Sequence, residues 1–371
     1  MSFVVRGFEE RDVAGVAELH RQVFQVRRES SPGLLAAYAR WLGEVLLGPG
    51  SGGPGMRSLV CEGAGGAIVG FMGVVPRAMA FGEERLVAAV STQFVVSEEA
   101  RAELAGVEMV RALLSGAQAL TICDEANDSS RRLWEAIGGA TALVPSLRFL
   151  RVLRPASVLG SLLVERGGEK KLRLLVGQLA RAVAAMTGGR VPRRLQVEAP
   201  ELRGREVEPE VIAEVLPALA PQAMLRAVHT GWEMAQRVRR ARWRAGAVRA
   251  RVESVLVEDA RGRAVGAYVN AGRAGEIERV LLFAAAPSAA RGVVQHLLYR
   301  AQEGGAIAVE GRLDRGLALA LSGGLTLFHR RGPWVLVHAR RAELAAALDR
   351  GDALFSPLDG ELCLRFVPER D

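Results

Sequence analysis

The two halves of the sequence repeat one pattern of strands and turns, and this repetition restricts the folds that the chain can adopt. Residues 57–71 and residues 253–268 each alternate apolar positions around a glycine-bearing turn, which predicts a β-hairpin in each half. Farther along, Gly138 and Gly323 each follow a helical pattern and precede two short strands. The matching segments lie roughly 190 residues apart and in the same order. We therefore predict two domains of one design, produced by duplication.

The repeat sets the expected domain boundaries within 371 residues, a length that suffices for two hydrophobic cores. We assign residues 1–152 to the first domain, 153–205 to a linker, and 206–371 to the second domain with its tail. Glycine and proline punctuate the linker, and a helical apolar period runs through residues 172–186. Residues 47–55 form a glycine-rich loop without the Lys-Ser/Thr pair of a phosphate-binding P-loop.

In each half, two strands are expected after the glycine that ends a helix. Residues 147–152 are the second of these strands in the first domain, and residues 334–337 are their counterpart in the second. In the tail, the pattern predicts a helix over 342–350, then a turn, and a strand over 361–366. We expect this last strand to close a sheet edge.

Composition favours a cytoplasmic protein with no membrane association and no metal. The chain is 50% hydrophobic, but no continuous apolar run is long enough to span a bilayer, and its first residues do not resemble a signal peptide. The three cysteines, Cys61, Cys123 and Cys363, are far apart in sequence, and the five histidines show no ligand spacing. We therefore expect neither a metal site nor a disulfide framework.

A net charge of +8 favours anionic partners, but it does not choose among them. Arginines crowd residues 237–251, with Trp232 and Trp243 nearby, a combination that can bind nucleic acid or dock on an acidic carrier protein. The same residues can also form an ordinary solvated helix face, and this interpretation is favoured over nucleic-acid binding. Association into a homodimer is left open.

A strand–turn–helix at residues 95–114 has the form of an anion site. The backbone N–H groups at a helix start lack intrahelical partners and carry the positive end of the helix dipole. Arg101 and Gly106 lie five residues apart across this turn. The turn resembles the acyl-CoA loop of the GCN5-related N-acetyltransferase (GNAT) superfamily, R/Q-x-x-G-x-G/A. Leu104 stands at the first glycine position, where a side chain would crowd a phosphate.

A second segment resembles the family signature N-x-x-(S/A)-x-x-L-Y-x-x-x-G-F. Asn127, Ser130, Trp134 and Gly138 fall at or close to matching places, and the resemblance covers residues 1–152. It implies an α/β (α+β) fold with two GNAT-like domains, each a mixed, mostly antiparallel twisted sheet flanked by helices.

The resemblance also implies a binding site for acetyl-CoA or another acyl-CoA. The thioester would lie where the strands at residues 93–96 and 120–123 splay apart, and Arg101 with the following amides would hold the pyrophosphate. The residues implied in cofactor binding are Phe94, Val95, Val96, Arg101, Ala105, Gly106, Asn127, Ser130 and Trp134.

The sequence lacks the residue that protonates the departing thiolate in many members of this family. Many family members use a tyrosine to protonate the departing thiolate, but Trp134 stands at that position, and an indole N–H is no usable acid. Asp124 and Glu125, just past the expected strand end, are candidate catalytic groups, as are Glu83 and Glu84 in the hairpin. Cys123 could accept an acyl group, although a buried strand cysteine is the favoured interpretation.

The sequence therefore predicts an N-acyltransferase, with acetyl as the favoured acyl group and a small-molecule or peptide amine as acceptor. The second domain is expected to be non-catalytic, because Arg291-Gly292 lacks the spacing of the acyl-CoA loop. The alternative is a degenerate pair of GNAT domains that acts as a CoA-binding, regulatory or partner-binding module. Leu104 and Trp134 motivate this alternative.

Overall fold

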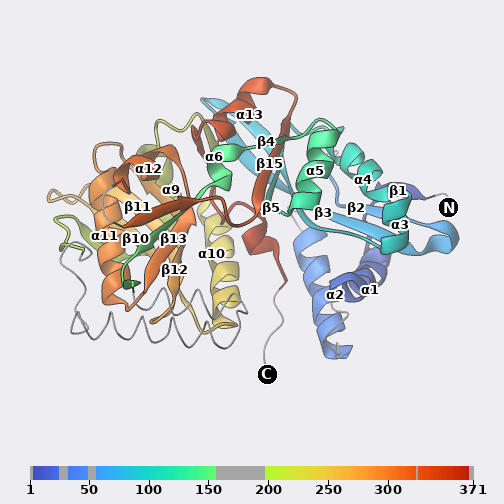
Figure 1. Ribbon diagram of the computed structural model, residues 1–371, viewed down its shortest axis with the longest axis horizontal. Coiled ribbons are helices and arrows are strands. Elements are labelled where there is room, and N and C mark those ends of the chain that lie inside the picture. Colours follow the sequence, from blue (N-terminus) through green and yellow to red (C-terminus); the bar gives the residue numbers. More distant parts are fainter. Residues whose placement is uncertain (1–2, 25–31, 49–55, 156–196, 323–324, 367–371) are drawn as a thin grey trace. The chain divides into compact units, whose positions relative to one another are not determined.

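The computed structural model divides the chain into two compact units, each built on one sheet (Figure 1). The structure describes residues 3–24, 32–48, 56–155, 197–322 and 325–366. The first unit comprises residues 1–143, 224–228 and 333–371, and the second comprises 144–223 and 229–332. The helix expected at 172–186 and most of the loop at 47–55 lie outside the described residues.

The sheet of the first unit follows the order β1-β2-β3-β4-β5-β15-β6, with β9 also paired to β3 and β16 to β9. Neighbours are antiparallel except for β4 with β5 and β9 with β16, which are parallel. The strands are β1 (Val4–Gly7), β2 (Leu59–Glu62), β3 (Ile68–Phe81), β4 (Glu84–Val96), β5 (Leu120–Ala126), β6 (Ala140–Thr141), β9 (Leu225–Ala227), β15 (Trp334–Ala339) and β16 (Ala353–Leu354).

Helices cover both faces of this sheet (Figure 1). Successive residues of a strand point to opposite faces. Val90 of β4 packs in a core with α1 and α2, whereas its neighbour Ala89 packs with α4 and α5. The helices are α1 (Val13–Phe24), α2 (Pro32–Leu46), α3 (Glu98–Ala102), α4 (Ala105–Leu114), α5 (Asp128–Ala136) and α13 (Ala342–Asp349), and α6 (Leu143–Ser146) follows β6.

The sheet of the second unit repeats this arrangement in the order β14-β7-β13-β12-β11-β10-β8. The predicted hairpin at 253–268 is β10 with β11, and β12 pairs parallel with β13. The elements are β7 (Arg148–Val152), β8 (Arg203–Glu206), α9 (Pro209–Leu219), α10 (Gly231–Gly246), β10 (Arg251–Glu258), β11 (Ala264–Gly272), β12 (Ile277–Ala285), α11 (Ala290–Glu303), β13 (Ala308–Arg312), α12 (Arg315–Ala320) and β14 (Thr326–His329).

Two strands pair in the sheet of the other half of the chain. β15, expected in the second domain, lies between β5 and β6 of the first unit, and β7, expected in the first domain, lies between β13 and β14 of the second. Both are short apolar strands that bury residues on two faces, so the local pattern identifies a strand but not its partner. The units are therefore discontinuous in sequence and do not follow the boundaries expected at residues 152 and 206.

The tail differs from its prediction in two elements, because the short strand β16 was not predicted and the strand expected at 361–366 is absent. The helix expected at 342–350 is present as α13, but a 3-10 helix, η4 (Glu361–Leu364), stands where a strand was expected. Two contacts hold the approach to η4: Arg77 Nε donates to the carbonyl of Asp359 at 2.9 Å, and Asp359 Oδ2 accepts the Ser356 N–H at 2.8 Å. The tail thus joins the sheet through the short strand β16, which pairs with β9, whereas residues 361–366 reach the sheet through side chains and turns.

Candidate active site

A gap opens in the first unit where β4 and β5 stop pairing. The parallel ladder joins only Ala88–Val90 to Leu120–Ile122. Both strands continue, β4 to Val96 and β5 to Ala126, without further pairing to each other. The space between the two strands beyond this point is therefore wide enough for an extended ligand.

A β-bulge in β4 marks the start of this gap. Met72 of β3 lies opposite both Gln93 and Phe94, and Gln93 has a φ of 54°. A bulge of this kind leaves one residue outside the ladder and bends the strand. The freed Gln93 N–H donates to Glu361 Oε1 over a long 3.4 Å, and the Gln93 side chain donates to the Leu364 carbonyl at 3.3 Å.

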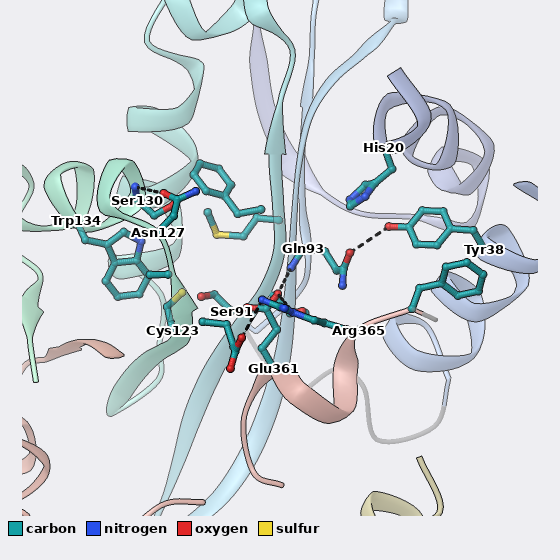
Figure 2. A pocket seen from close by; sticks show the side chains of 16 residues that line it. His20, Tyr38, Ser91, Gln93, Cys123, Asn127, Ser130, Trp134, Glu361 and Arg365 are labelled. Carbon is teal, nitrogen blue, oxygen red and sulfur yellow. Dashed lines mark hydrogen bonds and ion pairs between the residues drawn. The ribbon is translucent and has the colours of Figure 1, made fainter. Parts of the chain in front are cut away.

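A cavity of about 430 Å³ occupies the gap, and all of its lining belongs to the first unit (Figure 2). On one side of Gln93 lie Asn127, Ser130 and Trp134, and on the other lies Tyr38 (Figure 2). The lining residues are His20, Tyr38, Met72, Ser91, Thr92, Gln93, Phe94, Cys123, Glu125, Ala126, Asn127, Ser130, Trp134, Glu361, Arg365 and Phe366.

One hydroxyl in this lining is an orphan. Thr92 is 2% exposed, and its Oγ1 has no hydrogen-bond partner among the described atoms. A buried polar group without a partner costs free energy, so a ligand that supplies one gains affinity. The cavity therefore offers a polar contact beside the bulge.

Two carboxyl groups and one guanidinium charge the cavity. Arg365 lies 3.0 Å from Glu125 Oε2 and 3.6 Å from Glu361 Oε1. Glu361 is 9% exposed. Burial raises the pKa of its carboxyl to about 7, against the opposing effect of Arg365 and with help from Asp124 and Glu125. This group therefore changes charge near neutral pH.

Asp124 is a buried residue inside a strand, so the expectation that it follows the strand end is wrong. β5 continues to Ala126, so Asp124 and Glu125 lie inside the strand. Asp124 is 0% exposed and does not line the cavity, and its Oδ1 accepts the Glu361 N–H at 2.7 Å. A Cβ at Gly360 would clash with Asp124 Oδ2, so the carboxylate lies directly against the backbone that precedes Glu361. Only Glu125 of the predicted pair faces the cavity.

The helix expected to start near Gly106 is present as α4, but the short helix α3 stands where a turn was expected, and none of residues 101–106 lines the cavity. Leu104 precedes α4 with a φ of 64°, a left-handed conformation that suits glycine, and its side chain is 62% exposed. Arg101 Nε donates to the Val96 carbonyl at 2.9 Å, which places the arginine at the end of β4. A Cβ at Gly106 would lie 3.5 Å from the ring of Phe94, so the loop adjoins the cavity wall.

The other predicted cofactor residues divide between the cavity and the core. Phe94, Ser130 and Asn127 line the cavity, and Asn127 Oδ1 also caps α5 by accepting the Ser130 N–H at 2.8 Å. Val95 and Val96 are buried in the two cores on either face of the sheet. Trp134 is 2% exposed and belongs to the core, with one side on the cavity.

None of the three remaining catalytic candidates has a suitable environment. Cys123 lines the cavity, but burial raises the pKa of its thiol to about 12, so it is not a thiolate at neutral pH. Glu84 forms an exposed ion pair with Arg341 at 2.7 Å, and neither it nor Glu83 lines the cavity.

Sequence reasoning missed the residues that complete the cavity from distant segments. Glu361, Arg365 and Phe366 come from the tail, and His20 and Tyr38 come from α1 and α2. Burial lowers the pKa of His20 to about 4 and raises that of Tyr38, so both are neutral at pH 7. No local pattern distinguishes these residues from ordinary helix and tail positions.

The corresponding gap of the second unit is filled by side chains. β12 and β13 pair only at Ile277–Arg279 with Ala308–Glu310, as in the first unit. Beyond this point a Cβ at Gly311 would lie 2.7 Å from the ring of Phe149, which is buried there beside Val280. Among the described residues, the gap between these two strands is therefore part of a core.

The arginine cluster does not form a single solvated face. Arg237 is buried and donates to His229 Nδ1 at 2.6 Å, and Arg251 pairs with the buried Glu253. Only part of the cluster is exposed on α10, beside Trp232 and Trp243.

Within the described parts of the chain, no His, Cys, Asp or Glu cluster suits a metal ion, and no helix has both the length and the apolar character needed to cross a bilayer.

Comparison with known proteins identifies the fold. No protein-family model matches the sequence, and no curated protein matches it. Solved structures do match. A GCN5-related N-acetyltransferase from Anabaena variabilis aligns with a TM-score of 0.58 and 11% identity, over 92% of this chain and 74% of that one. One from Kribbella flavida aligns with a TM-score of 0.54 and 12% identity, over 95% and 73%.

A conserved protein of unknown function from Enterococcus faecalis aligns with a TM-score of 0.56 and 11% identity, over 91% of this chain and 72% of that one. The chain therefore has the fold of the GCN5-related N-acetyltransferases over most of its length, and the predicted fold class is confirmed. At such identities the likeness establishes the fold alone, and it does not identify a reaction or a substrate.

Proposed function

We propose that the first unit is an acyl-CoA-dependent N-acyltransferase whose reaction takes place in the gap between β4 and β5. The observation that carries this proposal is the divergence of these strands at the Gln93 bulge, with a cavity of about 430 Å³ between them. An extended amide-bearing arm such as pantetheine can insert between two strands that no longer pair with each other and hydrogen-bond to their backbone. The orphan hydroxyl of Thr92 and the amide of Gln93 fit this use of the gap.

The residues around the gap supply the functions that acyl transfer needs. The Gln93 N–H at the bulge is a fixed donor for the thioester carbonyl, on which negative charge develops during attack. Arg101 and the first amides of α4 offer positive charge to the pyrophosphate. The amine would approach from the side of Tyr38, opposite Asn127 and Ser130, where the ring of Phe366 packs against that of Tyr38. Acetyl-CoA is the first donor to test.

Calorimetric titration of acetyl-CoA tests the proposal. Arg101→Glu should weaken binding roughly tenfold or more, because it replaces a charge-assisted contact worth about 1.5–3 kcal/mol with repulsion. Arg291→Glu is the matched control, since it makes the same charge change on an exposed residue at the start of α11. Its affinity should equal that of the wild type. An Arg101→Glu variant that binds as well as wild type would refute the assignment of the loop.

A second measurement separates transfer from binding. A thiol reagent detects free CoA when the wild type is incubated with acetyl-CoA and primary amines. Release that depends on the amine supports the transferase. Binding without release supports the alternative of a degenerate CoA-binding or regulatory module, which the buried Trp134 at the family's tyrosine position favours.

A further inference from the structure

We propose that Glu361, delivered by the tail, is the base that takes the proton from the acceptor amine. This inference rests on the proposed function of the gap and adds to it a residue from outside the family-like segment of the sequence. Glu361 lines the cavity, and its Oε1 faces the N–H of Gln93 at the bulge (Figure 2). A group that polarises the carbonyl and a group that accepts the proton are thereby placed side by side.

The contact between Glu361 and Gln93 is loose enough to be exchanged. At 3.4 Å the hydrogen bond is longer than the usual range, and a thioester oxygen can replace the carboxylate as acceptor. The carboxylate then retains free lone pairs beside the carbonyl carbon. This is the position from which a base can reach an attacking nitrogen.

The backbone of Glu361 is held more firmly than its side chain. Its N–H donates to the buried Asp124 Oδ1 at 2.7 Å, and Gly360 allows that carboxylate to lie against the chain. Arg365 pairs with Glu125 at 3.0 Å and with Glu361 at 3.6 Å. Asp124 is therefore a positioning residue, and Glu361 is the group that faces the cavity.

The other titratable groups around the cavity are poor bases at neutral pH. From α1 and α2, His20 has a pKa lowered to about 4 by burial, and Tyr38 has a raised pKa and stays protonated. From β5, Cys123 has a pKa raised to about 12, and Glu125 is engaged by Arg365. Glu361, with a pKa of about 7, accepts a proton most readily where amine substrates are still ammonium ions.

The proton and electron balance of the step is complete. The Glu361 carboxylate takes one proton from the ammonium group, and the freed nitrogen lone pair forms the C–N bond at the thioester carbonyl. The C–S bond then breaks and its electron pair leaves on sulfur. The nitrogen loses a second proton as the sulfur gains one, and Glu361 returns its proton to solvent. The products are an amide, CoA thiol and one proton.

The pH dependence of transfer by wild type, Glu361→Gln and Glu44→Gln tests this role. The probes are acetyl-CoA with ethanolamine, phenethylamine or a tripeptide with a free N-terminus, and free CoA is measured with a thiol reagent. Glu44 is an exposed residue of α2 outside the cavity lining, so its variant controls for the loss of one carboxylate. Titration of acetyl-CoA into each variant measures binding separately from transfer.

The wild type and the control should lose kcat/KM below a pH of about 7, where Glu361 is protonated. Glu361→Gln should lower kcat/KM at neutral pH by about a hundredfold or more while it binds acetyl-CoA as wild type does. Its residual rate should rise with the free-amine fraction up to the amine's own pKa, near ~10 for an alkylamine. Glu361→Asp keeps a carboxylate, so its kcat/KM should still fall as the pH drops through the neutral range, although its rate should be lower than that of the wild type.

Each contrary outcome has a distinct meaning. If Glu361→Gln loses kcat/KM below a pH of about 7 as the wild type does, Glu361 is not the base, and the proposed function still stands. If the variant is slower at every pH but its kcat/KM falls at the same pH as that of the wild type, Glu361 has a structural role and is again not the base. A wild type that releases no CoA with any amine overturns the proposed function, and the assignment of Glu361 with it.

Discussion

Gly360 lies in the tail against the buried carboxylate of Asp124 in β5. A Cβ at this position would overlap Asp124 Oδ2 of β5. Gly360→Ala should therefore destabilise the protein by about 1–3 kcal/mol, as overpacking does in a well-packed interior. If the gap is the site of acyl transfer, the substitution should also slow that reaction, because η4 and Glu361 must shift. Urea unfolding and the CoA-release assay measure the two effects.

Gly43→Ala provides the comparison. Gly43 lies inside α2, and a Cβ there would meet no atom within 4 Å. Alanine should stabilise the helix by about 0.5–1 kcal/mol, since glycine has more freedom to lose on folding. Equal stabilities for wild type and Gly360→Ala would show that Asp124 does not hold the tail in solution.

Residues of the site were predictable to the extent that their contacts are local. Asn127 and Ser130 lie three residues apart in sequence, which is the spacing at which a side chain caps the start of a helix. Glu361 contacts Gln93 and Asp124 across more than half of the chain. Its burial, and with it the raised pKa, depends on that tertiary packing, which no local pattern encodes.

Leu104 shows how a single residue can strain the start of an element. It precedes α4 in the left-handed region, where an L residue with a Cβ is disfavoured by about 1–2 kcal/mol, and its exposed side chain makes little compensating packing. Leu104→Gly should raise the free energy of unfolding by about 1 kcal/mol. If the loop holds the pyrophosphate, it should also strengthen acetyl-CoA binding.

Urea unfolding and calorimetry check both expectations. Ala102→Gly, an exposed position within the neighbouring helix α3, is the control, and it should cost about 1 kcal/mol because its backbone is already helical. A Leu104→Gly variant as unstable as Ala102→Gly would show that the left-handed conformation is not maintained in solution.

Elements with a strong local period were predicted correctly, including the hairpins, α13 and the helix that starts beside Gly106. The prediction was wrong at 361–366, where alternating apolar residues form η4 rather than a strand. These residues point into the cavity and the core from a turn that Arg77 and Ser356 hold, so tertiary contacts override the local pattern. The end of β5 was misplaced for a similar reason: Asp124 is a buried strand residue because Glu361 satisfies it.

At the scale of the whole molecule, the exchange of β7 and β15 makes each unit depend on both halves of the chain. In the first unit β5 pairs with β15, through Leu336 with Cys123 and Val337 with Ile122. In the second unit β13 pairs with β7, through Gly311 with Phe149. The sequence alone could not reveal this, because the two strands have similar apolar patterns and partners more than 100 residues away.

The exchange predicts how the chain responds to division. Residues 1–152 alone would leave β5 with an unpaired edge and would carry β7 without its partners, so this fragment should aggregate or lack a cooperative unfolding transition. Co-expressed fragments 1–155 and 156–371 retain every described strand pair and should copurify with the secondary structure of the intact chain. Circular dichroism and size-exclusion chromatography distinguish these outcomes. A fragment 1–152 that is monomeric and unfolds cooperatively would contradict the exchange, because a self-sufficient first domain requires its own strand at the position of β15.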